Sequence, residues 1–257
     1  IEPHDFGRSY YWNENGAIQW HLDDANEIQK LVRQYGPEHI AAEAQRVLEE
    51  QVKNIIFPWM QREQTRNLST SGGVVLHVKL NQRLWESGHI ARHHTYPNPG
   101  DAGLAAGAAL YVYHQANADA PIHALEDLYF GPEYTDAEIE QALKLRRIEY
   151  RRMDDATAFA AEQLARDKIV AWFQGRMESG PRALGARSIL GDPRNTEMQS
   201  AMNLRIKFRE SFRPFAPCVL AEEASKWFDM EPGQESPYML LVAPVAESRR
   251  IQGTPEQ

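Results

Sequence analysis

The stretch KIVAWFQGRMESGPRALGARSILGDPR, residues 168–194, decides how the second half of the chain folds. Its first part, KIVAWFQG (168–175), is rich in apolar β-branched and aromatic residues, which predicts a buried strand. The strand leads into a segment that holds four arginines among glycines and prolines. Gly180 and Gly185 leave the backbone free to turn, so a side chain such as Arg182 can be held on a shaped loop. An arginine there presents a permanently charged fork of donors that fits phosphate or carboxylate oxygens.

These arginines stand out because the chain as a whole is acidic, with 28 Lys and Arg against 36 Asp and Glu in 257 residues and a net charge of -8. That balance disfavours broad attraction of nucleic acid, so any anion site must be local. No apolar run reaches the length of a membrane span, and the first residues, IEPHDFGRSYYW, lack a signal-peptide pattern. The single cysteine, Cys218, fits a reducing cytoplasm and is interpreted as a small buried residue. We therefore expect a globular cytoplasmic protein without a membrane or nucleic-acid partner, and the initial isoleucine suggests a piece of a longer chain.

A local anion site is predicted between residues 175 and 213, where seven arginines and Lys207 face four acidic residues. Arg182, Lys207 and Arg213 are the candidates, because glycine, proline or aromatic residues neighbour them. Arg205 and Arg209, four residues apart, fit a solvated helix face as well as a binding site. The glycine spacings of a P-loop and of a Rossmann fold are both absent from the chain.

The first half predicts a helix followed by a glycine turn. Apolar residues recur at helical spacing from 37 to 64, with Pro37 in the first turn, where no donor is needed. The next segment, 67–88, predicts a strand, a tight turn at Gly72 and Gly73, and a second helix. Such a turn lets the backbone approach a ligand, although a glycine pair by itself is weak evidence for one.

Two further patterns bear on a metal site. The stretch TYPNPGDAGLAAGAALYVYHQA (95–116) predicts a proline-rich loop and then a helix with Asp101 at its N-cap. From the spacing alone, Asp101 can be either a helix cap or a metal ligand. His89 and His93 have the spacing of a helical metal pair, but we expect this stretch to be extended, which separates them by about 13 Å.

The link 117–136 separates two halves of different composition, since all nine histidines precede residue 126 and the dense arginine cluster follows it. We place the domain boundary there, with domains at 1–125 and 126–257. The periodicity of the second half predicts helices near 136–147, 155–166, 195–206 and 221–228 and a strand at 238–245. Together with 168–175 these elements predict an α/β fold.

Three segments, in this order, resemble the O-carbamoyltransferases that modify nodulation factors and antibiotics. They are PNPGDAGLAAGAAL (97–110), GRMESGPRALGARSILGDPR (175–194) and FRESFRPFAPCVLAEEA (208–224). SGGVVLHVKLNQRL (71–84) and YFGPEYTDAEI (129–139) fit the same pattern, so the resemblance covers the chain from about residue 37. It implies that 1–125 is the C-terminal part of an actin/hexokinase-like (ASKHA) carbamoyl-transfer domain. It also implies that 126–257 is an α/β domain similar to the enzymes that make threonylcarbamoyl-adenylate, incomplete at its end.

The resemblance implies an ATP-dependent reaction in which carbamoyl phosphate and ATP give a carbamoyl-adenylate, and the carbamoyl group then passes to the hydroxyl of an unidentified small molecule. It assigns no catalytic residue, and it leaves a Mg²⁺ ion and a homodimer open. The residues that it places on carbamoyl phosphate and the nucleotide are Arg182, Lys207 and Arg213, with support from Arg176, Arg187 and Ser188. It places Gly72 and Gly73 on the nucleotide of the transferase domain and makes Asp101 a ligand of Fe²⁺.

The chain departs from the family pattern at several points. The family's His-x-x-x-His metal pair belongs to an N-terminal stretch of the transferase domain that this chain lacks. His77 stands where the family usually has asparagine, and Ser179 where it usually has phenylalanine. We therefore expect ligand binding by the arginine half, without catalysis by this piece alone. Two alternatives remain open: a non-catalytic anion-binding, nucleotide-binding or interaction module of the same fold, and an RNA-modifying relative, which the acidic balance disfavours.

Overall fold

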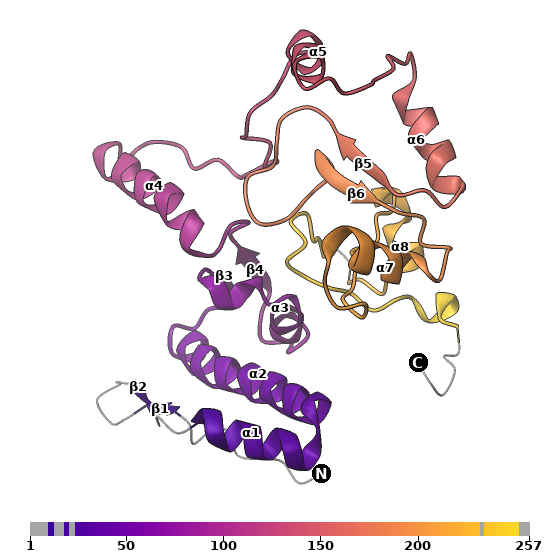
Figure 1. Ribbon diagram of the computed structural model, residues 1–257. Coiled ribbons are helices and arrows are strands. Elements are labelled where there is room, and N and C mark those ends of the chain that lie inside the picture. The colour runs from indigo at the N-terminus through magenta and orange to yellow at the C-terminus, as the bar shows by residue number, and fades with distance from the viewer. Residues whose placement is uncertain (1–9, 13–17, 21–23, 232–233, 252–257) are drawn as a thin grey trace. The chain divides into compact units, whose positions relative to one another are not determined.

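The computed structural model describes residues 10–12, 18–20, 24–231 and 234–251. The chain forms two compact units, Ile1–Tyr96 and Pro97–Gln257, each described below by itself (Figure 1). The sequence start discussed above lies in 1–9, outside the described residues. The family domain boundary expected at 125/126 stays a prediction.

The first unit combines two long helices with short strands. Strands β1 (Tyr10–Trp12) and β2 (Ile18–Trp20) pair antiparallel. Its other elements are α1 (Asp24–Tyr35), α2 (Pro37–Arg62), β3 (Asn67–Thr70), the 3₁₀ helix η2 (Gly73–Leu76), α3 (Val78–Trp85) and β4 (Arg92–Thr95). The helix predicted at 37–64 is confirmed as α2, with Pro37 in its first turn.

The core of this unit lies between α2, α3 and the strand pair. Met60, Leu80, Leu84 and Ile90 form a buried cluster, and both leucines of α3 are fully buried. Leu80 and Leu84 are four residues apart on α3, so they share the helix face that meets the cluster. Strands β3 and β4 run parallel, with Thr70 opposite Thr95 at their carboxyl ends.

The predicted strand, glycine turn and helix at 67–88 are confirmed. Gly72 has φ 103°, in the left-handed region that glycine adopts without strain. Asn81, fully buried on α3, donates its side-chain amide to the carbonyl of Val75 over 2.8 Å and so fixes the turn against the helix. The exposed backbone of Gly72 and Gly73 follows directly after β3.

The second unit is a mixed α/β assembly of short elements. Its longer elements are α4 (Leu104–Ala116), α5 (Asp136–Leu145), α6 (Ala156–Ala165), β5 (Val170–Phe173) and β6 (Arg187–Leu190). Shorter ones are η3 (Asp101–Gly103), α7 (Met198–Ala201), the π-helix η4 (Met202–Lys207), η5 (Ala221–Glu223), α8 (Ala224–Trp227) and η6 (Glu247–Arg249). The four helical segments predicted between 136 and 228 are all confirmed.

Local capping explains why two of these helices begin where they do. Thr135 and Glu138 form a reciprocal capping box at the start of α5. The Asp155 carboxylate accepts a hydrogen bond from the Ala158 amide, 2.8 Å away, at the start of α6. Both signals are readable in the sequence as an acidic or hydroxyl residue before an apolar run.

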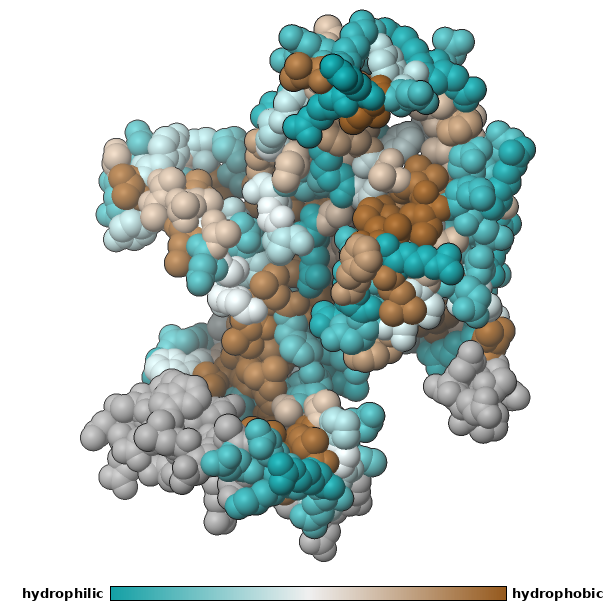
Figure 2. Space-filling view, in the orientation of Figure 1, coloured by the Kyte–Doolittle hydropathy of each residue, from teal (hydrophilic) through white to brown (hydrophobic). Residues whose placement is uncertain are grey.

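The strand predicted at 168–175 is confirmed as β5, but it is not buried. It pairs antiparallel with β6, which the sequence reasoning missed, and Phe173 lies opposite Arg187. Alternate residues of β5 face solvent, Phe173 with 54% of its surface exposed. Figure 2 shows apolar side chains at the surface over this hairpin. A two-stranded sheet has two faces, and here one stays open to solvent.

Three local expectations are wrong. No strand forms at 238–245, where the backbone makes a single antiparallel bridge from Val245 to Phe228. Cys218 is exposed, because it lies in an irregular segment between Pro217 and Val219 rather than in a core element. Asp101 caps no helix, since it is the first residue of η3 and the preceding Gly100 is the N-cap, without a side-chain hydrogen bond.

Among the described residues, we find no helix both long and apolar enough to cross a membrane.

Candidate anion-binding site

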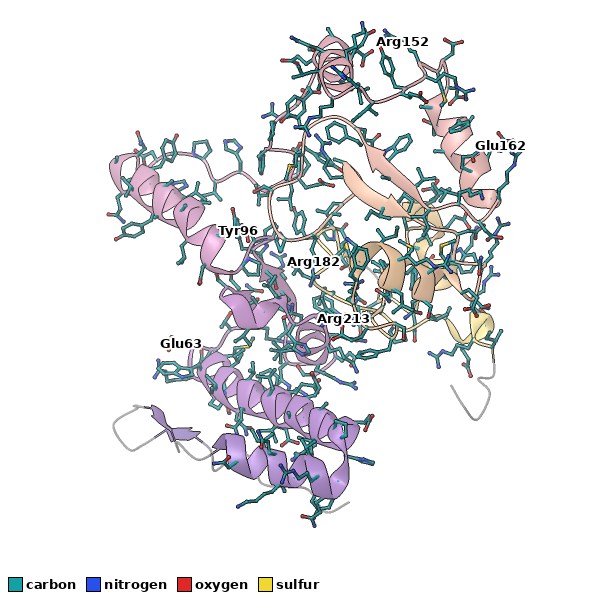
Figure 3. All side chains as sticks on the ribbon, in the orientation of Figure 1. Glu63, Tyr96, Arg152, Glu162, Arg182 and Arg213 are labelled. Carbon is teal, nitrogen blue, oxygen red and sulfur yellow. The ribbon has the colours of Figure 1, made fainter. Side chains whose placement is uncertain are left out.

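The loop between β5 and β6, residues 174–186 (hereafter the arginine loop), carries the central candidate, Arg182. Its backbone turns at glycines in the left-handed region, with φ 109° at Gly180 and 111° at Gly185. A side chain at either position would strain the backbone, so the two glycines set the shape of the loop. The side chain of Arg182, which lies between them, is half-buried (Figure 3).

The first limb of this loop is held by an extended segment, residues 128–132. The Ser179 amide donates to the Leu128 carbonyl over 2.7 Å, and the Gly131 amide donates to the Met177 carbonyl over 2.8 Å. A Cβ at Gly131 would lie 2.7 Å from that same carbonyl oxygen, so only glycine allows this approach. The segment that carries the resemblance motif YFGP thus forms the support of the arginine loop.

The returning limb of the loop is held by a buried carboxylate. Glu178 is 6% exposed, and its Oε1 accepts hydrogen bonds from the amides of Leu184 (2.8 Å), Ala186 (2.7 Å) and Arg187 (3.2 Å). Burial acts to raise the pKa of this carboxyl, but the backbone N–H donors outweigh burial and lower the pKa below its usual value. Glu178 is therefore ionised at neutral pH and places one negative charge inside the loop.

Arg187 and Ser188 build the base of the loop. The Arg187 guanidinium donates to the carbonyls of Gln174 (2.8 Å) and Gly175 (3.1 Å), and it lies over the Phe173 ring at 3.4 Å from the centroid. The Ser188 hydroxyl accepts a hydrogen bond from the Gly185 amide at 3.1 Å. These contacts give both residues a structural function, and ligand contact by either stays a prediction. Arg176 is exposed, with a long hydrogen bond of 3.5 Å to the Phe130 carbonyl.

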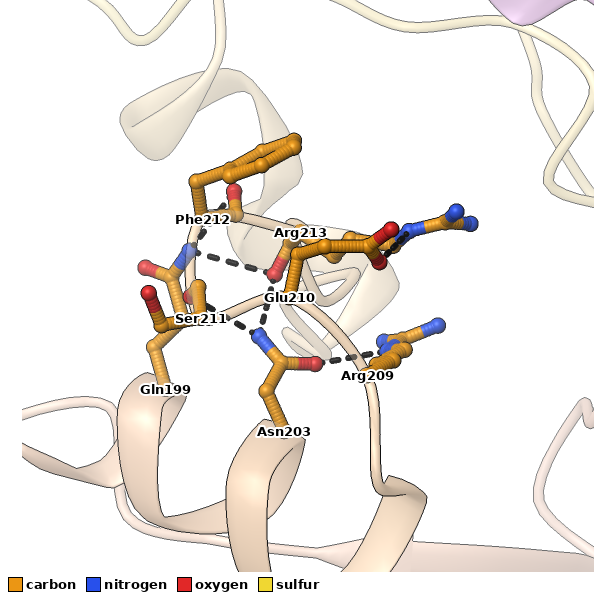
Figure 4. Close-up of polar contacts among 7 residues, drawn as sticks. All are labelled: Gln199, Asn203, Arg209, Glu210, Ser211, Phe212 and Arg213. Carbon is orange, nitrogen blue, oxygen red and sulfur yellow. Dashed lines mark hydrogen bonds and ion pairs between the residues drawn. The ribbon is translucent and has the colours of Figure 1, made fainter.

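A second loop, residues 208–213 (hereafter the clamp loop), carries Arg213 and follows Lys207, the last residue of the π-helix η4. Asn203 lies in that π-helix, is fully buried, and donates from Nδ2 to the carbonyls of Ser211 (3.0 Å) and Arg213 (2.7 Å) (Figure 4). Its Oδ1 accepts from the Arg209 Nε at 2.6 Å. One asparagine thus satisfies three groups of the clamp loop.

Gln199, one helical turn before Asn203, completes the clamp. Its Nε2 donates to the carbonyls of Phe212 (3.2 Å) and Arg213 (3.1 Å). The Arg213 side chain stays 54% exposed, with a 2.9 Å ion pair to Glu210, and Lys207 is exposed. The amides hold the backbone of the clamp loop and leave these two cations at the surface. Arg209 is not a solvated helix-face residue, because Asn203 takes its Nε and the guanidinium lies over Phe215.

The predicted sites of the first half are exposed. Gly72 and Gly73 present an open turn, and Asp101 faces solvent. Within the part of the chain that the structure describes, no three His, Cys, Asp or Glu side chains are grouped to hold a metal ion. The described residues therefore do not fit a complete iron site, and we derive no chemical step through iron.

His93 is extended on β4, as expected, and makes contacts across the strand pair. Its Nε2 lies 3.1 Å from the Thr70 hydroxyl and 3.3 Å from the Thr95 hydroxyl. Burial, and to a lesser extent the neighbouring His94, lowers the pKa of His93 below its usual value. The ring is therefore neutral at pH 7.

Comparison with known proteins gives two matches that follow one another along the chain. The family model of the carbamoyltransferase N-terminus matches residues 9–110, and that of the carbamoyltransferase C-terminus matches residues 161–254. The chain belongs to the carbamoyltransferase family. Gly72, Gly73 and Asp101 lie within the first match, and the arginine and clamp loops lie within the second.

Curated relatives of this carbamoyltransferase chain come from several bacteria. It is 36% identical to the nodulation protein NolNO of Sinorhizobium fredii and 34% identical to NolO of Bradyrhizobium diazoefficiens, in each case over 95% of its own length. It is 46% identical, over 85% of its length, to an uncharacterized protein of Synechocystis. The matches span 38%, 47% and 36% of these relatives, respectively.

Sequence reasoning named the candidate cations, whose contact with a ligand stays a prediction, and missed the side chains that hold their loops. Glu178 carries a readable signal, since it is the sole acidic residue between Arg176 and Asp192. Asn203 and Gln199 carry none, because an amide on a helix is common and only the folded loop shows what it binds.

Proposed function

We propose that this protein is an ATP-dependent O-carbamoyltransferase whose arginine and clamp loops bind the phosphate groups of carbamoyl phosphate and ATP. The observation that supports this most directly is that each loop has its backbone fixed by the protein's own side chains. Glu178 holds one loop and Asn203 holds the other, while Arg182, Lys207 and Arg213 supply positive charge. Donors fixed before the ligand arrives need little reorganisation when charge develops on it.

The number of donors suits a small phosphorylated ligand. A hydrogen bond to a charged group contributes about 1.5–3 kcal/mol, so three or four fixed ones are enough to hold a small phosphorylated ligand. Arginine suits this work better than lysine, because its planar fork contacts two phosphate oxygens at once. In this proposal Arg176 adds a further exposed cation beside the loop, while Arg187 and Ser188 keep its base in place.

In the proposed reaction, carbamoyl phosphate, ATP and water give a carbamoyl-adenylate, phosphate and pyrophosphate at the arginine half. The carbamoyl group then passes to a hydroxyl of a small acceptor at the other half, and AMP leaves. The finer fold assignment belongs to the same proposal. It comprises an actin/hexokinase-like domain with its nucleotide at Gly72 and Gly73, and a second domain similar to the threonylcarbamoyl-adenylate enzymes. Asp101 is the proposed contribution of this chain to an iron site.

Calorimetric titration with carbamoyl phosphate tests the binding proposal. We expect wild-type protein to bind it and Arg182→Ala to bind about tenfold or more weakly, which corresponds to the loss of one charged hydrogen bond. Arg152→Ala is the matched control, because Arg152 is 78% exposed and pairs with Asp136. Absence of binding by wild type, or equal binding by wild type and Arg182→Ala, would contradict the proposal.

A second assay separates the transferase from a non-catalytic module of the same fold. Formation of an adenylate from ATP releases pyrophosphate, whereas a binding module holds both ligands and releases none. We therefore measure pyrophosphate release with ATP alone, and with ATP and carbamoyl phosphate together. In the full-length protein, release that requires carbamoyl phosphate and is lost in Lys207→Ala supports the transferase, and binding of both ligands without release supports the module. This piece alone is expected to bind without release under either hypothesis.

A further inference from the structure

We infer that Glu178 is the positioning residue of the arginine loop: its carboxylate is a built-in anion that closes the loop and sets Arg182 before any ligand binds. The inference deepens the proposed function, on which its consequence for ligand binding rests. The part of the inference that concerns loop closure rests on the hydrogen bonds of Glu178 and does not depend on the proposed function.

Glu178 lies at the junction of a fixed segment and a free one. Its neighbours Met177 and Ser179 are hydrogen-bonded through their backbones to residues 128–132. Its side chain reaches across to the returning limb, 184–187, and collects three backbone N–H groups on one oxygen. The Tyr129 hydroxyl also donates to the Leu184 carbonyl over 3.2 Å, so Glu178, with three hydrogen bonds, is the main of two links between the fixed segment and the returning limb.

Gln174 and Arg187 close the base of the loop through hydrogen bonds, and Glu178 adds a link above that base, near Arg182 in the sequence. Gly180 and Gly185, on the two sides of Arg182, are the residues with the greatest backbone freedom in the unfolded or open chain. The loop and its base also carry Arg176, Arg182 and Arg187, whose mutual repulsion favours opening. The buried carboxylate opposes opening, since it accepts the three backbone N–H groups that converge on it.

The three N–H groups that Glu178 occupies form a small anion-binding concavity of the kind that successive backbone amides make. Because the protein's own carboxylate fills it, a bound phosphate meets the Arg182 guanidinium rather than these amides. The conformational entropy of ordering the loop is then lost during folding and not during binding, which favours the affinity for the ligand. Glu178 acts through Arg182 and has no direct contact with the ligand in this account.

Hydrogen exchange and calorimetry on the same variants test the inference. In Glu178→Ala we expect the amides of Leu184, Ala186 and Arg187 to exchange about tenfold or more faster, and the affinity for carbamoyl phosphate to fall by about the same factor. Glu178→Gln keeps an acceptor oxygen at the same place, so we expect it to recover part of both losses. Glu162→Ala, which removes an exposed carboxylate from α6, is the matched control and changes neither.

The outcomes separate this inference from the proposed function. Unchanged exchange at the three amides in both Glu178 variants overturns the inference, and so does faster exchange with unaltered affinity. If wild type fails to bind carbamoyl phosphate, the proposed function is wrong, and inorganic pyrophosphate then replaces it as the anion whose affinity must fall in Glu178→Ala. Arg182→Ala should weaken binding without changing the exchange, a split that a merely destabilised loop does not produce. If Glu178→Ala fails to fold, Glu178→Gln alone decides both measurements.

Discussion

The cationic side chains of residues 175–213 divide into two groups by what they contact. Arg187 and Arg209 donate to groups of the protein, and each lies over an aromatic ring. Arg194 is bound bidentately by Asp192, and the hydrogen bonds from Arg194 hold the pKa of that carboxyl at about 2. Lys207 and Arg213 remain exposed at the end of a clamped segment. The cluster is thus partly a scaffold, and Lys207 and Arg213 are among the members that it leaves at the surface.

The amide clamp makes a first prediction. Asn203→Ala removes the donors to two carbonyls and the acceptor for Arg209, all at a fully buried position. We expect a loss of about 2–3 kcal/mol in the free energy of unfolding, because buried partners are left unsatisfied. Urea denaturation measures it. Gln199→Ala is the matched control and should cost less, since its two hydrogen bonds are longer (3.2 and 3.1 Å) and more exposed; an equal or larger loss there would contradict this ranking.

His93 makes a second prediction at the same scale. Its pKa is lower in the folded protein than in the unfolded chain, so the unfolded state binds more protons just below the ordinary histidine pKa. The contribution of His93 to stability is therefore full above about pH 6.5 and falls as the pH drops below it, by about 1.4 kcal/mol per unit of pKa difference. Denaturation at pH 7 and pH 5 should show a smaller pH effect in His93→Gln than in wild type. His123→Gln, at an exposed position, should behave as wild type, and the same pH effect in both variants would refute the assignment.

At the scale of the element, the patterns that depend on local sequence were predictable. Helix periodicity identified α2, α5 and α6, and the Gly72–Gly73 turn appeared where two glycines interrupt an apolar pattern. β6 was missed because its four residues, RSIL, directly follow the glycine-rich motif and carry no strand pattern of their own. Only the pairing with β5 shows that they form a strand. The strand expected at 238–245 failed for the same physical reason, since an apolar run forms a strand only where another strand pairs with it.

The pairing of segment 128–132 with the arginine loop makes a third prediction. A methyl group at Gly131 would lie 2.7 Å from the Met177 carbonyl oxygen, and backbone cannot move aside as a side chain can. We expect Gly131→Ala to cost about 1–3 kcal/mol and to speed hydrogen exchange at Ser179. Gly107→Ala is the matched control, because a Cβ there meets nothing within 4 Å and alanine favours the helix α4. A Gly131→Ala protein as stable as the Gly107→Ala protein would show that the close approach is not needed.

At the scale of the whole molecule, eight of the 28 lysines and arginines of this acidic chain lie between residues 175 and 213, in the second unit. The sequence predicts a local anion site there, because glycine, proline and arginine in a fixed order are readable without a structure, and anion binding by this region stays a prediction. It did not predict how the loops that carry these cations are held, since that depends on Glu178, Asn203 and Gln199. These side chains lie 6–14 residues along the chain from the groups they bind, and only the folded loops bring the two together.

The division into two compact units makes the last prediction. Each unit has buried side chains of its own, with Leu84 fully buried in the first and Asn203 fully buried in the second. Proteins built from separate units often unfold in more than one step, so we expect scanning calorimetry to show two transitions. Leu84→Ala, which leaves a cavity beside Met60 and Leu80 and costs about 2–5 kcal/mol, should lower one transition. Asn203→Ala should lower the other, whereas a single transition that both variants shift alike would mean that the two units unfold as one cooperative body.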